Sequence, residues 1–152
     1  MQILALLAQK KTLFSEFENV TETMYCMQAE DLAAAMDQRG LLLEQVAELD
    51  RQLAACAAGR EDIRAALAHS CGREGLAPQL AEIYDAALAV KAVVNRLIKN
   101  KDSVYLHLES EKQRIRAKME ELNSGGASVA ERYHQSVLTS VSPQPKKTDK
   151  II

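Results

Sequence analysis

The sequence predicts an all-α protein, an elongated antiparallel bundle of three long helices with a short C-terminal amphipathic helix. Three observations support this fold class. Apolar residues recur in steps of three and four over long stretches, helix breakers are few and clustered, and no stretch alternates apolar and polar residues as a strand does. The composition agrees, because 47% of the residues are hydrophobic and only 4% aromatic, which is typical of aliphatic helix seams.

The first predicted helix covers residues 1 to about 28. Its apolar positions follow the helical spacing, with Lys10 as the one polar interruption. These positions are Ile3, Leu6, Leu13, Phe17, Val20, Met24 and Met27. Asp31 is expected to cap the next helix, because a short acidic side chain can accept hydrogen bonds from the free amides of a helix start.

The second predicted helix extends from about Leu32 to Leu67. A glycine inside a helix costs roughly 1 kcal/mol relative to alanine, which a long packed seam can absorb. We therefore expect both Gly40 and Gly59 to lie within this helix.

The third predicted helix follows a turn that contains Gly72, Gly75 and Pro78. Its apolar spacing persists over 77–122, which could reach ~70 Å at the rise of an α-helix. The second and third helices are expected to form a hairpin, and the shorter first helix to cover only part of it. Apolar residues near the hairpin tip should then have fewer partners than those lower down. They are Ile63, Leu67, Leu76, Leu80 and Ile83.

The segment after the third helix predicts a hinge and one more helix. Asn123 is expected to end the long helix, and Gly125 with Gly126 to allow a change of direction. A short helix should follow, with Val129, Tyr133 and Val137 on one face. The predicted organisation is one helical domain over residues 1–140 and a flexible polar tail over 141–152.

Charge and cysteine content narrow the class of partner. A net charge of −2 and a pI near 5.9 provide no basic field for nucleic acid or an anionic membrane. The apolar N-terminal stretch ILALLA is too short to span a bilayer. Three widely spaced cysteines do not form a disulfide framework, which favours a reducing cytoplasm. We expect protein partners, and neither nucleic acid nor membrane insertion.

Candidate chemical sites are weak. His69 and Cys71, with Cys56 upstream, lack the closely paired ligands of structural zinc. The Glu131 to His134 step is single, whereas di-iron bundles need two such steps and two further glutamates. The cysteines fall in or beside aliphatic seams, where buried thiols are usually inert. We expect no catalytic residue, no metal and no cofactor, and therefore no enzyme.

Three stretches together resemble the small helical export chaperones of bacterial flagella, the FlgN/FliT-like group. An acidic turn leads into a helix with a mid-helix arginine and an apolar triplet, a later helix carries an asparagine with paired aliphatics, and a glycine and a tyrosine lie near the end. The matching residues are Asp31, Arg39, Leu41 to Leu43, Asn95, Leu97, Ile98, Gly125 and Tyr133. The likeness spans most of residues 1–135.

The resemblance implies a cytosolic chaperone without cofactor or reaction. It would bind the helical termini of late flagellar subunits, namely hook–filament junction or filament-cap proteins, and deliver them to the type III export apparatus. An amphipathic terminus exposes an apolar stripe before assembly, and an apolar groove can cover it. The candidate partner-binding residues lie on the open hairpin faces and the terminal helix. They are Leu80, Ile83, Val90, Leu97, Tyr105, Leu108, Val129, Tyr133 and Val137.

Two other classes stay open from the sequence. The long seam could pair with a second copy, which would make the protein a homodimer and a coiled-coil scaffold or adaptor. A small enzyme or metal carrier in a four-helix setting is the third class. The terminal helix could contact a client, cap its own bundle, or alternate between these two roles.

Overall fold

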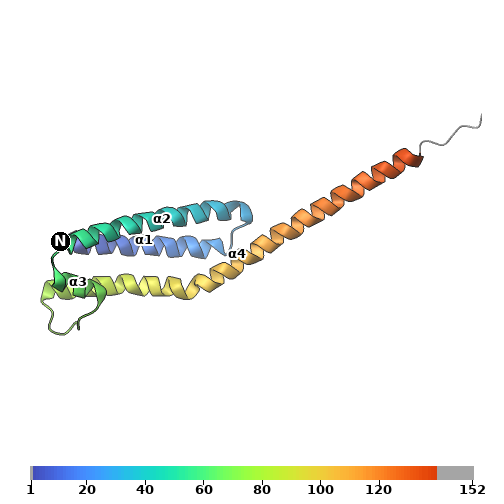
Figure 1. The fold of residues 1–152 in the computed structure, drawn as a ribbon. Coiled ribbons are helices and arrows are strands. Elements are labelled where there is room, and N and C mark those ends of the chain that lie inside the picture. The colour runs from blue at the N-terminus through green and yellow to red at the C-terminus, as the bar shows by residue number, and fades with distance from the viewer. Residues whose placement is uncertain (1, 140–152) are drawn as a thin grey trace, which may run out of the picture. The chain divides into compact units, whose positions relative to one another are not determined.

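The computed structural model describes residues 2–139, except for the side chains of 126–130, 132 and 135–139. The described residues form four α-helices and no strand, so the all-α class is confirmed. The helices are α1 (Gln2–Met24), α2 (Ala29–Cys56), α3 (Glu61–Ala68) and α4 (Pro78–Thr139) (Figure 1).

The chain divides into two compact units, Met1–Glu111 and Lys112–Ile152. The first unit contains α1, α2, α3 and the first part of α4, and the second unit contains the rest of α4. The predicted single domain of residues 1–140 thus spans both units. The predicted tail of 141–152 lies outside the described residues.

The main core of the first unit lies where the start of α1, the end of α2, α3 and the start of α4 meet (Figure 1). α2 runs antiparallel to α1, as Figure 1 shows. The buried side chains come from all four helices and from the residue after α2. They are Ile3, Leu6, Leu7, Leu49, Leu53, Ala57, Ile63, Ala66, Ile83, Ala87 and Val90. Burying one large aliphatic side chain stabilises the fold by about 1.5–3 kcal/mol, so this cluster is the chief source of stability.

A second, smaller core contains Met24, Leu32 and Ala35, with Leu108 of α4 packed against it. It lies beside the turn between α1 and α2. α2 begins after Gln28, which makes no side-chain capping bond. The prediction of Asp31 as N-cap was wrong, because Asp31 lies inside the first turn of α2. Its negative charge there interacts favourably with the positive end of the helix dipole.

The predicted helix through Gly59 is interrupted. α2 ends at Cys56 and α3 begins at Glu61, with Gly59 at φ +73°, a left-handed conformation that glycine adopts without steric cost. The Arg60 N–H donates to the Ala57 carbonyl over 3.0 Å and closes the turn. Gly40, in contrast, lies within α2 as predicted.

The turn between α3 and α4 confirms the predicted reversal near Gly72, Gly75 and Pro78. α3 ends at Ala68, and the next residue, His69, caps the helix with a left-handed φ of 53°. The His69 ring lies 4.6 Å from the Tyr84 ring in an edge-on arrangement, and its Nε2 lies 3.1 Å from the Tyr84 carbonyl oxygen. α4 then begins at Pro78, where the missing amide costs no helix bond.

The hairpin tip is better covered than predicted. Ile63 and Ile83 are buried, and Leu67, Leu76 and Leu80 are half-buried. The expectation of fewer partners was wrong for Ile63 and Ile83, because the start of α1 packs at this end of the bundle.

α4 contains no break at the double glycine. The helix runs from Pro78 to Thr139, so the separate short C-terminal helix expected after Asn123 is not observed. Gly125 lies within α4 and has no left-handed φ. The neighbouring Ser124 hydroxyl donates to the Glu121 carbonyl over 3.0 Å, a local bond compatible with helix. A helix end would leave four carbonyls without partners, a larger cost than the weak propensity of glycine.

Candidate functional site

A groove of about 380 Å³ lies in the first unit between α2 and α4, with α1 at its base. We call it the Arg39 groove. Its volume falls within the usual ~300–1,000 Å³ range of binding sites. Its lining residues come from α1, α2 and α4, far apart in the chain. They are Phe17, Met36, Arg39, Gly40, Leu43, Lys101, Val104, Tyr105 and Leu108.

Arg39 lies half-buried in this groove without a carboxylate among its described partners. Its guanidinium carbon lies 4.5 Å from the centre of the Phe17 ring, a cation–π contact. One terminal nitrogen, Nη1, lies 3.8 Å from the Met24 sulfur and 3.6 Å from the Met36 sulfur, both weak acceptors. The Nε atom is buried and has no hydrogen-bond partner among the described residues.

Burial affects the ionisation of this guanidinium. It lowers the pKa of Arg39 from its usual value, and the neighbouring Tyr105 and Tyr25 oppose that shift weakly. The side chain nevertheless stays charged, because arginine does not deprotonate in proteins. Arg39 is therefore a partly desolvated cation held mainly by an aromatic ring and two sulfur atoms.

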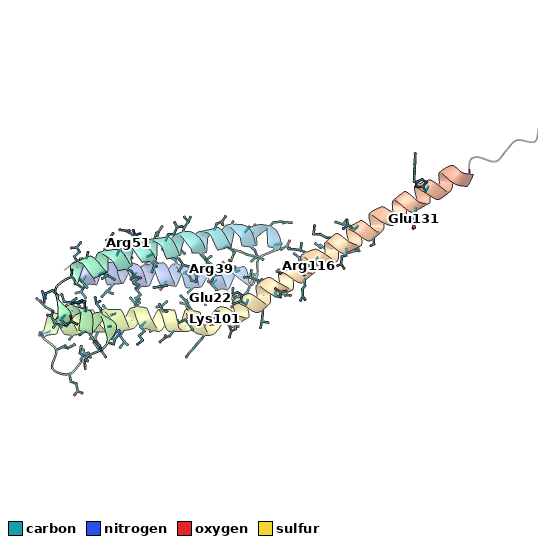
Figure 2. All side chains as sticks on the ribbon, viewed as in Figure 1. Glu22, Arg39, Arg51, Lys101, Arg116 and Glu131 are labelled. Carbon is teal, nitrogen blue, oxygen red and sulfur yellow. The ribbon has the colours of Figure 1, made fainter. Side chains whose placement is uncertain are left out.

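The α4 wall of the groove combines a buried base with exposed groups at its edge. Val104 is buried and Leu108 is half-buried against the second core. Tyr105 is 70% exposed, and Lys101 is exposed one turn before it. Figure 2 labels Arg39 on α2 and Lys101 on α4.

Large apolar side chains are exposed around the Arg39 groove. Met36 is 44% exposed and Leu43 is 48% exposed on the α2 side, facing the same groove as Tyr105. Single exposed apolar residues are ordinary on soluble proteins, but their grouping around one groove is a feature of interaction sites. This grouping makes the Arg39 groove a candidate interaction site.

Three other cavities of the first unit are less suited to a partner. One contains Lys10 and Asp50, which form an ion pair, and a second contains Arg60 and Asp62, which are also paired. The third is a furrow between α1 and α2, and the large apolar residues that line it, Leu13 and Leu49, are at least half-buried. None of these three combines exposed large apolar side chains with a cation that lacks a carboxylate partner.

The structure distributes the predicted partner-binding residues over different environments. Ile83 and Val90 are buried in the main core, and Leu80 packs against it. Leu97 is half-buried. Their contacts are thus mainly with this chain itself.

Tyr105 and Leu108 are the two predicted residues that the structure brings together in the Arg39 groove. Tyr133 is 73% exposed in the second unit. The side chains of Val129 and Val137 lie outside the described residues.

Sequence reasoning did not select Phe17, Met36, Gly40 or Lys101 as site residues. One signal was available: Arg39 follows Leu32 and Ala35 and precedes Leu42 at helical spacing, which places a cation on an apolar stripe. Which stripe residues remain exposed depends on how non-local helices pack, and this is not encoded in local spacing.

The described residues contain no group of three or more His, Cys, Asp or Glu side chains that could hold a metal ion. Cys26, Cys56 and Cys71 are free thiols. Across residues 2–139, none of the helices has a stretch long and apolar enough to cross a membrane.

Comparisons with protein-family models, with characterised proteins and with solved structures gave no match.

Proposed function

We propose that this protein is a cytoplasmic, non-catalytic chaperone that binds a helical terminus of a late flagellar subunit in the Arg39 groove. The client would be a hook–filament junction or filament-cap protein, delivered to the type III export apparatus. The observation that carries the proposal is the groove itself, an apolar concave surface whose exposed Met36, Leu43 and Tyr105 are arranged around one opening. The client class rests on the resemblance of Arg39, Leu41 to Leu43 and Leu97 to the FlgN/FliT-like group.

A helix is the ligand that best fits this surface. The walls are two helices, and an amphipathic helix can lay its apolar face between them as a third. Tyr105 offers a large apolar body with a polar tip, which is compatible with both the free and the bound state. Met36 is unbranched and flexible, so it can adapt to different client side chains.

The test is capture of clients from a lysate of a flagellated bacterium, with the full chain as bait. Recovery of junction or cap subunits is expected. Tyr105→Ala should weaken this capture, because Tyr105 lines the groove, whereas Leu106→Ala should not. The two residues are adjacent and similarly exposed, at 70% and 73%, so Leu106 is a matched control. Absence of junction and cap subunits from the captured proteins would contradict the proposed client class.

A self-associating scaffold or adaptor is the second candidate. Ile115, Met119 and Leu122 lie at four- and three-residue steps in the second unit and are 38%, 60% and 75% exposed. Such a stripe is typical of a helix that pairs with another. Sedimentation equilibrium of the pure protein decides between the two: a tight homodimer that dissociates on Met119→Glu would favour the scaffold.

A further inference from the structure

We infer that the helix bound in the Arg39 groove carries an aspartate or glutamate on its apolar face, and that this carboxylate pairs with Arg39 and Lys101. The inference rests on the proposed function and adds the chemistry by which the groove would select its ligand. Its basis is the charge of the groove, which is independent of the family resemblance.

Arg39 differs in its partners from Arg60, Arg73 and Arg96, which also lie in the first unit. Arg60, Arg73 and Arg96 each donate two hydrogen bonds to one carboxylate, those of Asp62, Asp85 and Glu18. Arg39 instead contacts the Phe17 ring and two methionine sulfurs. A desolvated cation is costly unless it is paired, so a groove with this group in its wall favours an anionic ligand atom.

The remaining lining of the groove adds positive charge and no negative charge. Lys101 is its second cation, and none of the nine lining residues carries a carboxylate. A ligand carboxylate would thus have two cations and no lining anion. The rest of the lining is apolar, apart from the Tyr105 hydroxyl, so the carboxylate must belong to an otherwise apolar helix face.

The same charge pattern disfavours a second copy of this chain as the occupant. Its exposed stripe of Ile115, Met119 and Leu122 lies in a stretch with four cations, Lys112, Arg114, Arg116 and Lys118, and two glutamates. Docking this stretch would bring a net positive charge against Arg39 and Lys101, and like charges at an interface are repulsive. An acidic helix from another protein fits the groove better.

The test uses two synthetic amphipathic helical peptides of identical composition. One has glutamate at the centre of a leucine face and lysine on the outer face, and the other exchanges these two residues. Fluorescence anisotropy with the full chain measures both affinities at low and at physiological salt. The peptide with the central glutamate should bind about tenfold more tightly, since charge-assisted hydrogen bonds are the strong ones at interfaces.

Two variants assign this preference to the groove. Arg39→Met replaces the charged side chain with an unbranched apolar one. It should remove most of the preference for the peptide with the central glutamate. Lys101→Glu affects an exposed side chain, leaves the core intact and should reduce or reverse the preference. Lys99→Glu is the matched control, because it makes the same charge change on the same helix outside the groove lining.

Equal affinity for the two peptides would overturn the inference, as would equal effects of Lys101→Glu and Lys99→Glu. Binding of neither peptide would also overturn it. The proposed chaperone function is decided separately, by client capture and its loss in Tyr105→Ala, so the two proposals can fail independently. Circular dichroism of Arg39→Met shows whether the variant is folded, and Lys101→Glu decides the question if it is not.

Discussion

The Arg96 guanidinium of α4 donates two hydrogen bonds to the Glu18 carboxylate of α1, from Nε over 2.9 Å and from Nη2 over 3.0 Å. The two residues are 78 positions apart in the chain, so this pair joins the first helix to the last within the first unit. Glu18 is mostly covered, with 16% of its side chain exposed, whereas Arg96 is open to solvent. The contact is bidentate, which is the favourable geometry for an otherwise modest ion pair.

The ion pair predicts a pH dependence of stability. The hydrogen bond from Arg96 lowers the pKa of Glu18, while burial opposes this shift. A carboxyl group with a lowered pKa in the folded state contributes stability that is present above its unfolded pKa of about 4.3 and is lost as the pH falls through the folded pKa. Glu18→Gln should therefore lower the melting temperature at pH 7 by roughly 1–3 °C and have a smaller effect at pH 3.

The measurement is thermal unfolding of both proteins between pH 7 and pH 3. Glu16→Gln is a suitable control, because Glu16 is exposed on the same helix, α1, and does not contact Arg96. A difference between the native protein and Glu18→Gln that stays constant down to pH 3 would show that the Arg96 contact does not act through ionisation of Glu18.

Much of the fold was predictable because it follows from local spacing. Steps of three, four or seven residues between apolar positions indicate helices without any tertiary information. Such steps join Ile3, Leu6 and Leu13, and also Leu42, Val46, Leu49 and Leu53. Glycine was harder to interpret. Gly40 and Gly59 look equivalent on the seam, but Gly59 precedes Arg60, Glu61 and Asp62, and an acidic pair after a glycine is typical of a new helix start.

The candidate site was less predictable than the helices. Tyr105 and Leu108 were selected because they lie on the predicted open face of the third helix, but Phe17, Met36 and Lys101 share the groove with them only because α1, α2 and α4 meet there. Long-range packing also explains why Ile83 and Val90, on the same seam, are buried. Spacing specifies a helix face, and the partner of that face depends on the whole bundle.

Two isoleucines of α4 provide a matched test of the core. Ile83 is 3% exposed within the main core, and Ile98 is 56% exposed on the same helix. Ile83→Ala should lower the free energy of unfolding by about 2–4 kcal/mol, because it removes buried methyl groups and leaves a cavity. Ile98→Ala should change it by less than about 0.5 kcal/mol.

Urea denaturation followed by circular dichroism measures both variants. The comparison also bears on the sequence prediction that Ile83 binds a partner, since the buried position makes any loss of binding a consequence of unfolding. Equal destabilisation by the two alanines would mean that the start of α4 does not pack as described.

The turn at Gly59 predicts a position-specific response to alanine. Gly59 has φ +73°, where a side chain is strained, although no neighbouring atom would clash with a Cβ. Gly59→Ala should therefore destabilise the first unit by about 1 kcal/mol. Gly40→Ala, within α2 and also in open space, should stabilise it by up to about 1 kcal/mol. Urea denaturation measures the change in the free energy of unfolding for both variants. Changes of opposite sign would support the interruption between α2 and α3, whereas stabilisation by both alanines would favour one continuous helix.

Gly125 provides the corresponding test of α4. The sequence predicts a hinge at this residue, whereas the structure has it within the helix, with open space where a Cβ would lie. Gly125→Ala should increase the helical signal of the full chain and stabilise its helix by about 1 kcal/mol, because alanine loses less backbone entropy than glycine. Gly125→Pro should reduce the helical signal, since proline removes a backbone donor and clashes with the preceding turn. Circular dichroism at 222 nm over a temperature series measures both effects. If neither substitution changes the helical signal at 222 nm, residue 125 is not helical in solution. That result would support the hinge that the double glycine predicts.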